Sequence, residues 1–264
     1  MTEAAGPILV FDSGIGGLSV LDAIRALMPT RQCLYVADDA AFPYGDWEED
    51  ALVDHIVQVM ERLVAAHGPR AIVIACNTAS TLVLPALRAR FSIPIVGTVP
   101  AIKPAAAQTK SGVIAVLATP GTIARDYTRQ LIEEFASNIH VELVASRRLA
   151  AIAEQFLQTG TIDPETVRAE IAPCFVEING KRTDIVVLGC THYPFLIPHM
   201  SAAAPWPVEW LDPAPAIAQR LQSLIGNDAR VAEGDGFSLF TGGAVPASLA
   251  GMLRERGVAP LTSP

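Results

Sequence analysis

Two short segments of the sequence carry a cysteine in nearly the same setting. Ala71–Thr78 reads AIVIACNT, and Ile185–His192, 114 residues later, reads IVVLGCTH. We expect Cys76 and Cys190 each to end a buried strand where a helix begins. Free N–H groups and partial positive charge at a helix start favour a thiolate. Two such thiols facing one cleft would act on opposite faces of one carbon, one removing a proton and the other delivering one. That is the chemistry of a racemase.

Polar side chains follow several other apolar runs, where ligands bind in open parallel sheets. We interpret Asp12 as a group that assists Cys76 or contacts a substrate ammonium, with a turn acid or helix cap as the alternative. His192 lies two residues after Cys190 and would assist its proton transfer, with a structural role as the alternative. Further candidate residues at these strand ends are Ser13, Asp38, Asp39, Tyr44, Gly45, Asn77, Thr78 and Thr191. Pro43-Tyr44-Gly45 fits either a turn or a substrate clamp.

Other functions stay open on the residues alone. Gly14 and Gly16 begin a pattern like the dinucleotide fingerprint, but its third position is Ser19, and Asp12 would place negative charge beside a pyrophosphate. A pyridoxal phosphate enzyme needs a Schiff-base lysine, and Lys103, Lys110 and Lys181 all lie away from these strand ends. We therefore expect no cofactor. The four cysteines include no Cys-x-x-Cys pair, which argues against a zinc knuckle, and we expect no metal. A racemase for aspartate or another amino acid, and a non-catalytic amino-acid-binding protein, remain alternatives.

The elements that must hold these residues alternate between strands and helices. Continuous apolar runs indicate strands covered on both faces, and the runs Leu18–Leu27 and Ala51–Leu63 have helical periodicity. The pattern predicts an α/β fold with largely parallel sheets, in two related lobes: residues 1–98 with 208–264, and residues 99–207. The strands are expected at Ile8–Phe11, Cys33–Ala37, Ala71–Ala75, Pro94–Val96, Val113–Leu117, Val141–Val144, Ile185–Leu188 and Val208–Leu211.

Composition narrows the class of protein. The chain has 264 residues, is 51% hydrophobic and 17% charged, and carries a net charge of −8, which argues against a general nucleic-acid binder. No apolar run reaches the length of a membrane helix, and the first residues lack a basic region, so we expect neither a membrane protein nor a signal peptide. A cytoplasmic protein with reduced thiols follows, and we interpret Cys33 and Cys174 as small core residues.

The motifs resemble those of bacterial glutamate racemases. The matching strings are FDSGIGGLSV, PYG, CNTAS and GCTHYP, at Phe11–Val20, Pro43–Gly45, Cys76–Ser80 and Gly189–Pro194. The resemblance implies a cofactor-independent enzyme that interconverts L- and D-glutamate and supplies D-glutamate for peptidoglycan. It also implies two pseudo-symmetric three-layer lobes, an active site in the cleft between them, and a homodimer.

Residue by residue, the resemblance assigns the proton transfers. Cys76 would act on D-glutamate and Cys190 on L-glutamate, with Asp12 and His192 as their helpers. The substrate-binding positions would be Asp12, Ser13, Tyr44, Gly45, Asn77, Thr78, Thr191 and His192. One stretch departs from the family pattern: Ala145-Ser146-Arg147-Arg148-Leu149 stands where a Cys-Pro pair and an apolar stretch are usual, with Glu154 in the expected position of a site glutamate.

Overall fold

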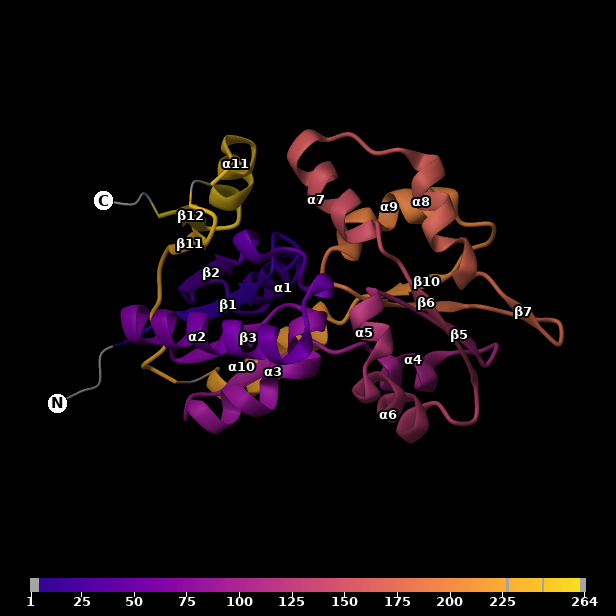
Figure 1. The fold of residues 1–264 in the computed structure, drawn as a ribbon, viewed down its shortest axis with the longest axis horizontal. Helices are drawn as coiled ribbons and strands as arrows, with labels where there is room; N and C mark the ends of the chain where they lie inside the picture. The colour runs from indigo at the N-terminus through magenta and orange to yellow at the C-terminus, as the bar shows by residue number, and fades with distance from the viewer. Residues whose placement is uncertain (1–4, 227, 244, 262–264) are drawn as a thin grey trace. The chain divides into compact units, whose positions relative to one another are not determined.

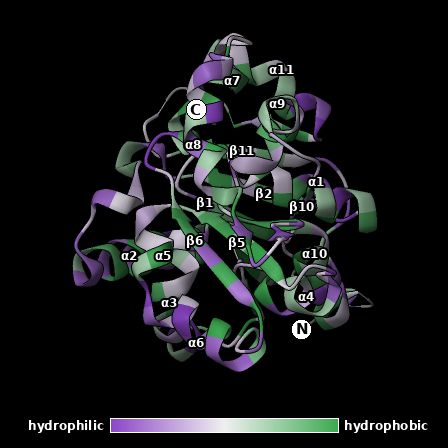
Figure 2. Cartoon of the chain, turned by 90° about the vertical axis from the view of Figure 1, so that its right-hand side faces the viewer, coloured by the Kyte–Doolittle hydropathy of each residue, from purple (hydrophilic) through white to green (hydrophobic). Residues whose placement is uncertain are grey.

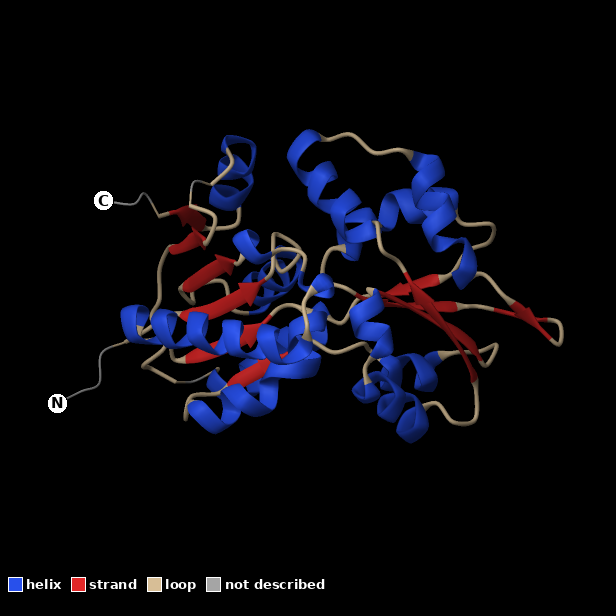
Figure 3. Ribbon diagram, in the orientation of Figure 1, coloured by secondary structure: helices blue, strands red, loops and turns tan. Residues whose placement is uncertain are grey.

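The chain forms two compact α/β units. The computed structural model describes residues 5–226, 228–243 and 245–261. The first unit comprises the described residues of Met1–Thr98 and Ala214–Pro264, and the second comprises Val99–Pro213. The expectation that the chain has no signal peptide concerns its first residues, of which residues 1–4 lie outside the described ones. Each unit has a parallel sheet with helices on both faces (Figures 1 and 3), so the predicted α/β class with parallel sheets is confirmed.

The first unit is built on a six-stranded parallel sheet in the order β12-β11-β2-β1-β3-β4. The strands at its centre are almost fully apolar and buried on both faces, as a doubly covered parallel sheet requires. Its strands are β1 Ile8–Asp12, β2 Cys33–Ala37, β3 Ala71–Ile74, β4 Ile95–Gly97, β11 Gly236–Phe240 and β12 Val258–Pro260.

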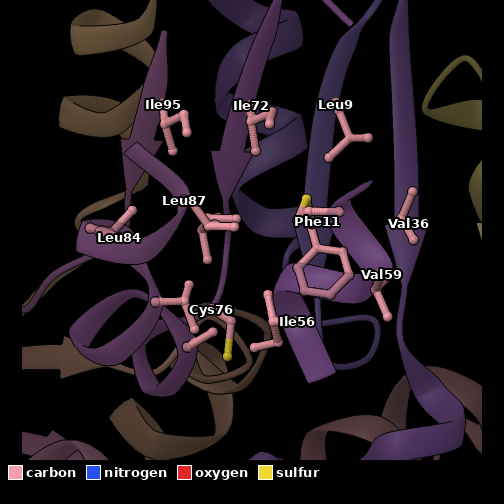
Figure 4. Packing of buried hydrophobic residues seen from close by; sticks show 14 of the residues in the cluster. Leu9, Phe11, Val36, Ile56, Val59, Ile72, Cys76, Leu84, Leu87 and Ile95 are labelled. Carbon is pink, nitrogen blue, oxygen red and sulfur yellow. The ribbon is translucent and has the colours of Figure 1, made fainter. Parts of the chain in front are cut away.

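Helices α2 and α3 cover one face of this sheet. Residues from α2, such as Ile56 and Val59, and from α3, such as Leu87, pack against strand residues that include Phe11 (Figure 4). Cys76 belongs to the same cluster, at the carboxyl end of β3. The helices of this unit are α1 Leu18–Leu27, η1 Asp39–Ala41, η2 Tyr44–Asp46, α2 Glu49–His67, α3 Asn77–Arg90, α10 Ala214–Ile225 and α11 Ala247–Glu255.

The second unit has a four-stranded parallel sheet in the order β10-β9-β5-β6, and a separate antiparallel pair, β7 and β8. One face of the sheet packs against α7, α8 and α9, and the other against α4 and α6. Its strands are β5 Val113–Ala118, β6 His140–Ala145, β7 Glu177–Ile178, β8 Lys181–Arg182, β9 Ile185–Gly189 and β10 Glu209–Leu211. Its helices are α4 Ile102–Gln108, α5 Pro120–Ala124, α6 Asp126–Phe135, α7 Leu149–Thr159, α8 Pro164–Ile171, η3 Ala172–Cys174, η4 Tyr193–Leu196 and α9 Ile197–Ala203.

Hydrophobic residues are concentrated along the strands, and helices such as α2 and α6 carry both hydrophilic and hydrophobic residues (Figure 2). This is the pattern of amphipathic helices that cover an apolar sheet. No helix among the described residues combines the length and the apolar character needed to cross a membrane.

Two sequence-based expectations are corrected here. Strand β10 pairs with β9, so residues 208–213 join the second unit and not the first. Cys190 does not stand at the start of a long helix. The short 3-10 helix η4 begins three residues later, at Tyr193, and α9 begins only at Ile197. Both η4 and α9 have a proline in the first turn, where the missing N–H of proline is tolerated. The prolines therefore favour separate helix starts at Tyr193 and at Ile197.

Candidate active site

Cys76 lies at the junction of β3 and α3. It is the N-cap of α3, a helix of 14 residues, and its carbonyl accepts the Ser80 N–H at 2.9 Å. Its backbone is still extended, with φ −139° and ψ 121°, so the sulfur is held where the strand ends and the helix begins. The residue is 6% exposed. The predicted placement of this thiol at a strand end and a helix start is confirmed.

Asp12 and Ser13 lie beside Cys76 because β1 pairs with β3. The Ser13 hydroxyl is 3.8 Å from the Cys76 sulfur. The Asp12 carboxylate is completely buried and accepts the backbone N–H of Ser13 at 2.8 Å and that of Gly17 at 2.5 Å. Asp12 thus organises the loop between β1 and α1, which is the turn-acid role weighed above, and it does so next to the thiol.

The same loop explains why the glycine run is not a dinucleotide fingerprint. Its Gly17 N–H, which would face a phosphate, is donated to the Asp12 carboxylate. A Cβ on Gly17 would come within 2.8 Å of the Asp12 Cβ and 3.1 Å of the Ala75 Cβ. The glycine is therefore required by close packing of α1 on β1 and β3, and a pyrophosphate would meet a carboxylate at this point.

Tyr44 joins the Cys76 surroundings from η2. Its hydroxyl donates to Asp38 Oδ2 at 2.5 Å, and the side chain is buried. Burial raises the pKa of Tyr44 far above its ordinary value, and the negative charges of Asp38, Cys76 and Asp12 raise it further. Gly45 follows, with open space around the position a Cβ would take. We refer to Asp12, Ser13, Tyr44, Cys76 and Asn77 as the Cys76 cluster.

Asn77 is the first residue of α3 and is 2% exposed. Neither its amide nitrogen nor its amide oxygen has a hydrogen-bond partner among the described residues. Buried polar groups are almost always paired, so an open donor and acceptor beside a thiol indicate a place for a ligand. Thr78, 5% exposed, follows on the same turn.

Cys190 lies at the end of β9 in the second unit and is 7% exposed. Its sulfur is 3.6 Å from His192 Nδ1, and His192 Nε2 is 2.9 Å from Glu154 Oε1. A carboxylate accepts a hydrogen bond from Nε2 in the tautomer that carries its proton there, and in that tautomer Nδ1 presents a lone pair to the thiol. We refer to Cys190, Thr191, His192 and Glu154 as the Cys190 cluster.

The two clusters therefore support their thiols differently. Cys76 has a helix start, a hydroxyl and a nearby tyrosine. Cys190 has a histidine fixed by a carboxylate, an arrangement in which imidazole can accept the thiol proton and hold it as imidazolium. His192 is 2% exposed and the Glu154 side chain 16%, so this relay is shielded from water.

The segment that departs from the family pattern lies next to the Cys190 cluster. Ser146 is buried, donates to Glu170 Oε2 at 2.6 Å and accepts the Leu149 N–H at 3.1 Å. Arg148 immediately precedes α7, whose residue Glu154 reaches His192. The unusual residues thus start the helix that carries Glu154 and leave the contact between Glu154 and His192 in place.

The other two thiols are structural. Cys33 and Cys174 are both fully buried. Burial raises the pKa of Cys33 to about 11 and that of Cys174 to about 12. A thiol that holds its proton this strongly is a poor base at neutral pH.

Comparison with known proteins identifies the family. The family model described as Asp/Glu/Hydantoin racemase matches residues 17–221. The chain belongs to this racemase family. It is 55% identical to a glutamate racemase of Mesorhizobium japonicum over 255 residues, covering 96% of this chain and 97% of that one. It is 60% identical to a glutamate racemase of Brucella anthropi over 224 residues, covering 84% and 81%.

A solved glutamate racemase has the same fold. The crystal structure of the Escherichia coli enzyme, in complex with L-glutamate and the activator UDP-MurNAc-Ala, superposes with a TM-score of 0.88 at 36% identity and covers 97% of both chains. The resemblance to glutamate racemases is thereby confirmed, and so is the class of enzyme: this racemase family member is an isomerase.

Proposed function

We propose that this chain interconverts L- and D-glutamate with Cys76 and Cys190 as the two acid/base groups. The observation that carries the proposal is the pair of slightly exposed thiols at the ends of β3 and β9, each with its own polar support, in a chain 55–60% identical to glutamate racemases. Its product D-glutamate would serve peptidoglycan synthesis.

The reaction moves one proton off Cα and another onto it. With D-glutamate bound, the Cys76 thiolate takes the Cα proton and becomes a thiol, and the bond electrons stay on Cα as a carbanion. The Cys190 thiol then delivers its proton to the opposite face, leaving L-glutamate and a Cys190 thiolate. In the reverse direction the roles exchange. Inversion needs the second group because a proton returned by the first would restore the starting enantiomer.

In this mechanism His192 and Glu154 assist Cys190. His192 Nδ1 takes the thiol proton when Cys190 must act as a base, and the Glu154 carboxylate stabilises the imidazolium that results. Asp12 and Ser13 support Cys76: the Asp12 carboxylate, fixed by two loop N–H groups, can accept the substrate ammonium, and the Ser13 hydroxyl contacts the sulfur.

Substrate binding would draw on donors that the clusters hold ready. The Asn77 amide, which has no hydrogen-bond partner among the described residues, can donate to a substrate carboxylate, and the hydroxyls of Ser13, Thr78 and Thr191 are further donors. Tyr44 and Gly45 would close one wall. No arginine is needed, because several hydrogen-bond donors and a helix start can hold a carboxylate.

The proposal requires glutamate to be enclosed with the two sulfur atoms on opposite sides of its Cα. Enclosure would exclude water and so strengthen the interactions that stabilise the carbanion. We also propose that the protein is cytoplasmic and forms a homodimer. Its mass in solution tests the homodimer.

The experiment is proton exchange in heavy water with no added cofactor. Each enantiomer is incubated separately, and optical rotation and Cα deuterium are followed from early conversion. The two-thiol mechanism gives a product that carries solvent deuterium, while the remaining substrate stays largely protiated. Protein that binds glutamate but shows neither racemisation nor exchange would overturn the proposal and favour a binding protein. Faster turnover of aspartate than of glutamate would reassign the substrate.

A further inference from the structure

The Asp38 carboxylate is contacted by three side chains from other parts of the first unit. Tyr44 Oη donates to Oδ2 at 2.5 Å, His55 Nε2 lies 2.6 Å from the same oxygen, and Thr241 Oγ1 donates to Oδ1 at 2.7 Å. Asp38 is 1% exposed. A carboxylate can accept all three contacts, with His55 donating in the tautomer that carries its proton on Nε2.

This arrangement fixes the direction of the Tyr44 hydroxyl. A phenol has one proton, and Tyr44 gives it to Asp38. Tyr44 and Cys76 pack in the same buried cluster, and toward that cluster the oxygen has only lone pairs to offer. Tyr44 can therefore accept a hydrogen bond from a substrate ammonium or from the Cys76 thiol, and it cannot donate one to a substrate carboxylate.

His55 holds the other end of this chain of contacts. It projects from α2, and its side chain is 27% exposed. The centroid of its ring lies 5.0 Å from that of the Trp47 ring. Trp47 Nε1 in turn donates to the Ala41 carbonyl at 3.0 Å. The imidazole is thus oriented by packing as well as by its bond to Asp38. Without it, Oδ2 keeps Tyr44 and Oδ1 keeps Thr241, so the carboxylate loses one of its three side-chain contacts and is held less firmly.

We propose that His55 is a positioning residue for the proton transfer at Cys76. It fixes Asp38, which fixes Tyr44 as an acceptor facing the Cys76 cluster, and Thr241 supports the same carboxylate from the other side. This inference rests on the proposed function, because it assigns His55 to one of the two half-reactions. The half-reaction at Cys190 lies in the second unit and should not depend on His55.

The test is the variant His55→Phe, which keeps an aromatic ring beside Trp47 and removes both ring nitrogens, including the Nε2 that contacts Asp38. Losing one charge-assisted hydrogen bond is expected to lower kcat/KM about tenfold. The fall must be equal in both directions, because the enantiomers have equal free energy and the equilibrium constant is one. Isotope effects separate the half-reactions.

With Cα-deuterated D-glutamate, the isotope effect on kcat/KM should rise, since the slowed step is the one that breaks this bond at Cys76. With Cα-deuterated L-glutamate it should fall, since removal of that deuteron by Cys190 becomes less limiting. A general loss of active protein would lower both rates and leave both isotope effects unchanged.

Three further variants complete the design. His55→Gln places an amide N–H near the position of Nε2 and should restore kcat/KM to within about threefold of the wild type. Thr241→Val, at an exposed position, should shift the isotope effects in the same directions by smaller amounts. His67→Phe is the matched control, because His67 lies on the same helix and contacts Phe237. It should match the wild type.

Unchanged isotope effects in His55→Phe, or no rescue by His55→Gln, would overturn the inference. If His55→Phe does not fold, Thr241→Val tests the same carboxylate. Wild-type isotope effects in Thr241→Val would overturn the role assigned to Asp38, and with it that of His55. A wild-type protein that does not racemise glutamate refutes the proposed function itself, so the two failures are distinguishable.

Discussion

Replacing Asn77 with leucine should make the protein more stable and less active. The amide is 2% exposed, and neither of its polar atoms has a partner among the described residues. A buried, unpaired polar group costs about 1–3 kcal/mol, and leucine has a similar shape without that cost. Taking the low end of that range, we expect the free energy of unfolding to rise by about 1 kcal/mol, which raises the thermal midpoint by roughly 2–4 °C in a chain of this size.

The same change should weaken catalysis. If the amide donates to a substrate carboxylate, that bond involves a charged group and is worth about 1.5–3 kcal/mol, so kcat/KM should fall about 10- to 100-fold. The assay is racemisation of each enantiomer by circular dichroism, beside thermal unfolding of the same preparation.

Ser80→Ala is the matched control on the same helix. The Ser80 hydroxyl donates to the Ile74 carbonyl and accepts the Thr98 N–H, both at 2.9 Å. Its loss should lower the unfolding free energy by about 1–2 kcal/mol and leave the KM for glutamate near the wild-type value. Lower stability with full activity in Asn77→Leu would refute the reasoning about the open amide.

Three further changes test other parts of the structure. Glu154→Leu removes the carboxylate 2.9 Å from His192 and should lower kcat/KM about tenfold; full activity would show that His192 acts without it. Gly17→Ala places a Cβ 2.8 Å from that of Asp12 and should cost about 1–3 kcal/mol of stability by overpacking, measured by urea unfolding; wild-type stability would contradict the packing. Burial raises the pKa of Cys33 to about 11 and that of Cys174 to about 12, so the unfolded chain loses these protons first, and stability should fall as pH rises above about 9. Loss of this fall in a Cys33→Ala, Cys174→Ala variant is the check, and an unchanged pH profile in that variant would contradict it.

Sequence periodicity predicted the central strands well because each is a continuous apolar run covered on both faces. Cys33–Ala37 and Leu18–Leu27 have the predicted bounds. Strand β11, Gly236–Phe240, was missed because its residues alternate between buried and half-buried and no apolar run stands out. Strand β12 has three residues and ends in proline, so it carries little signal.

The polar residues at strand ends were predictable because a parallel sheet brings its carboxyl ends to one edge. The supporting contacts were not. Thr241 reaches Asp38 across 203 residues of sequence, and His55 lies within a helix where nothing local indicates a partner. The helix start expected at Cys190 was wrong because the likeness to the Cys76 segment ends at the thiol, and the prolines that follow set a different geometry.

Hydrogen exchange by single-thiol variants tests the division of labour between Cys76 and Cys190 most directly. In heavy water, Cys190→Ala should wash deuterium into the Cα position of D-glutamate, leave L-glutamate protiated and racemise neither. Cys76→Ala should do the reverse. Exchange of both enantiomers by either variant, or of the opposite enantiomer by each, would contradict the assignment of one thiol to each face of the substrate.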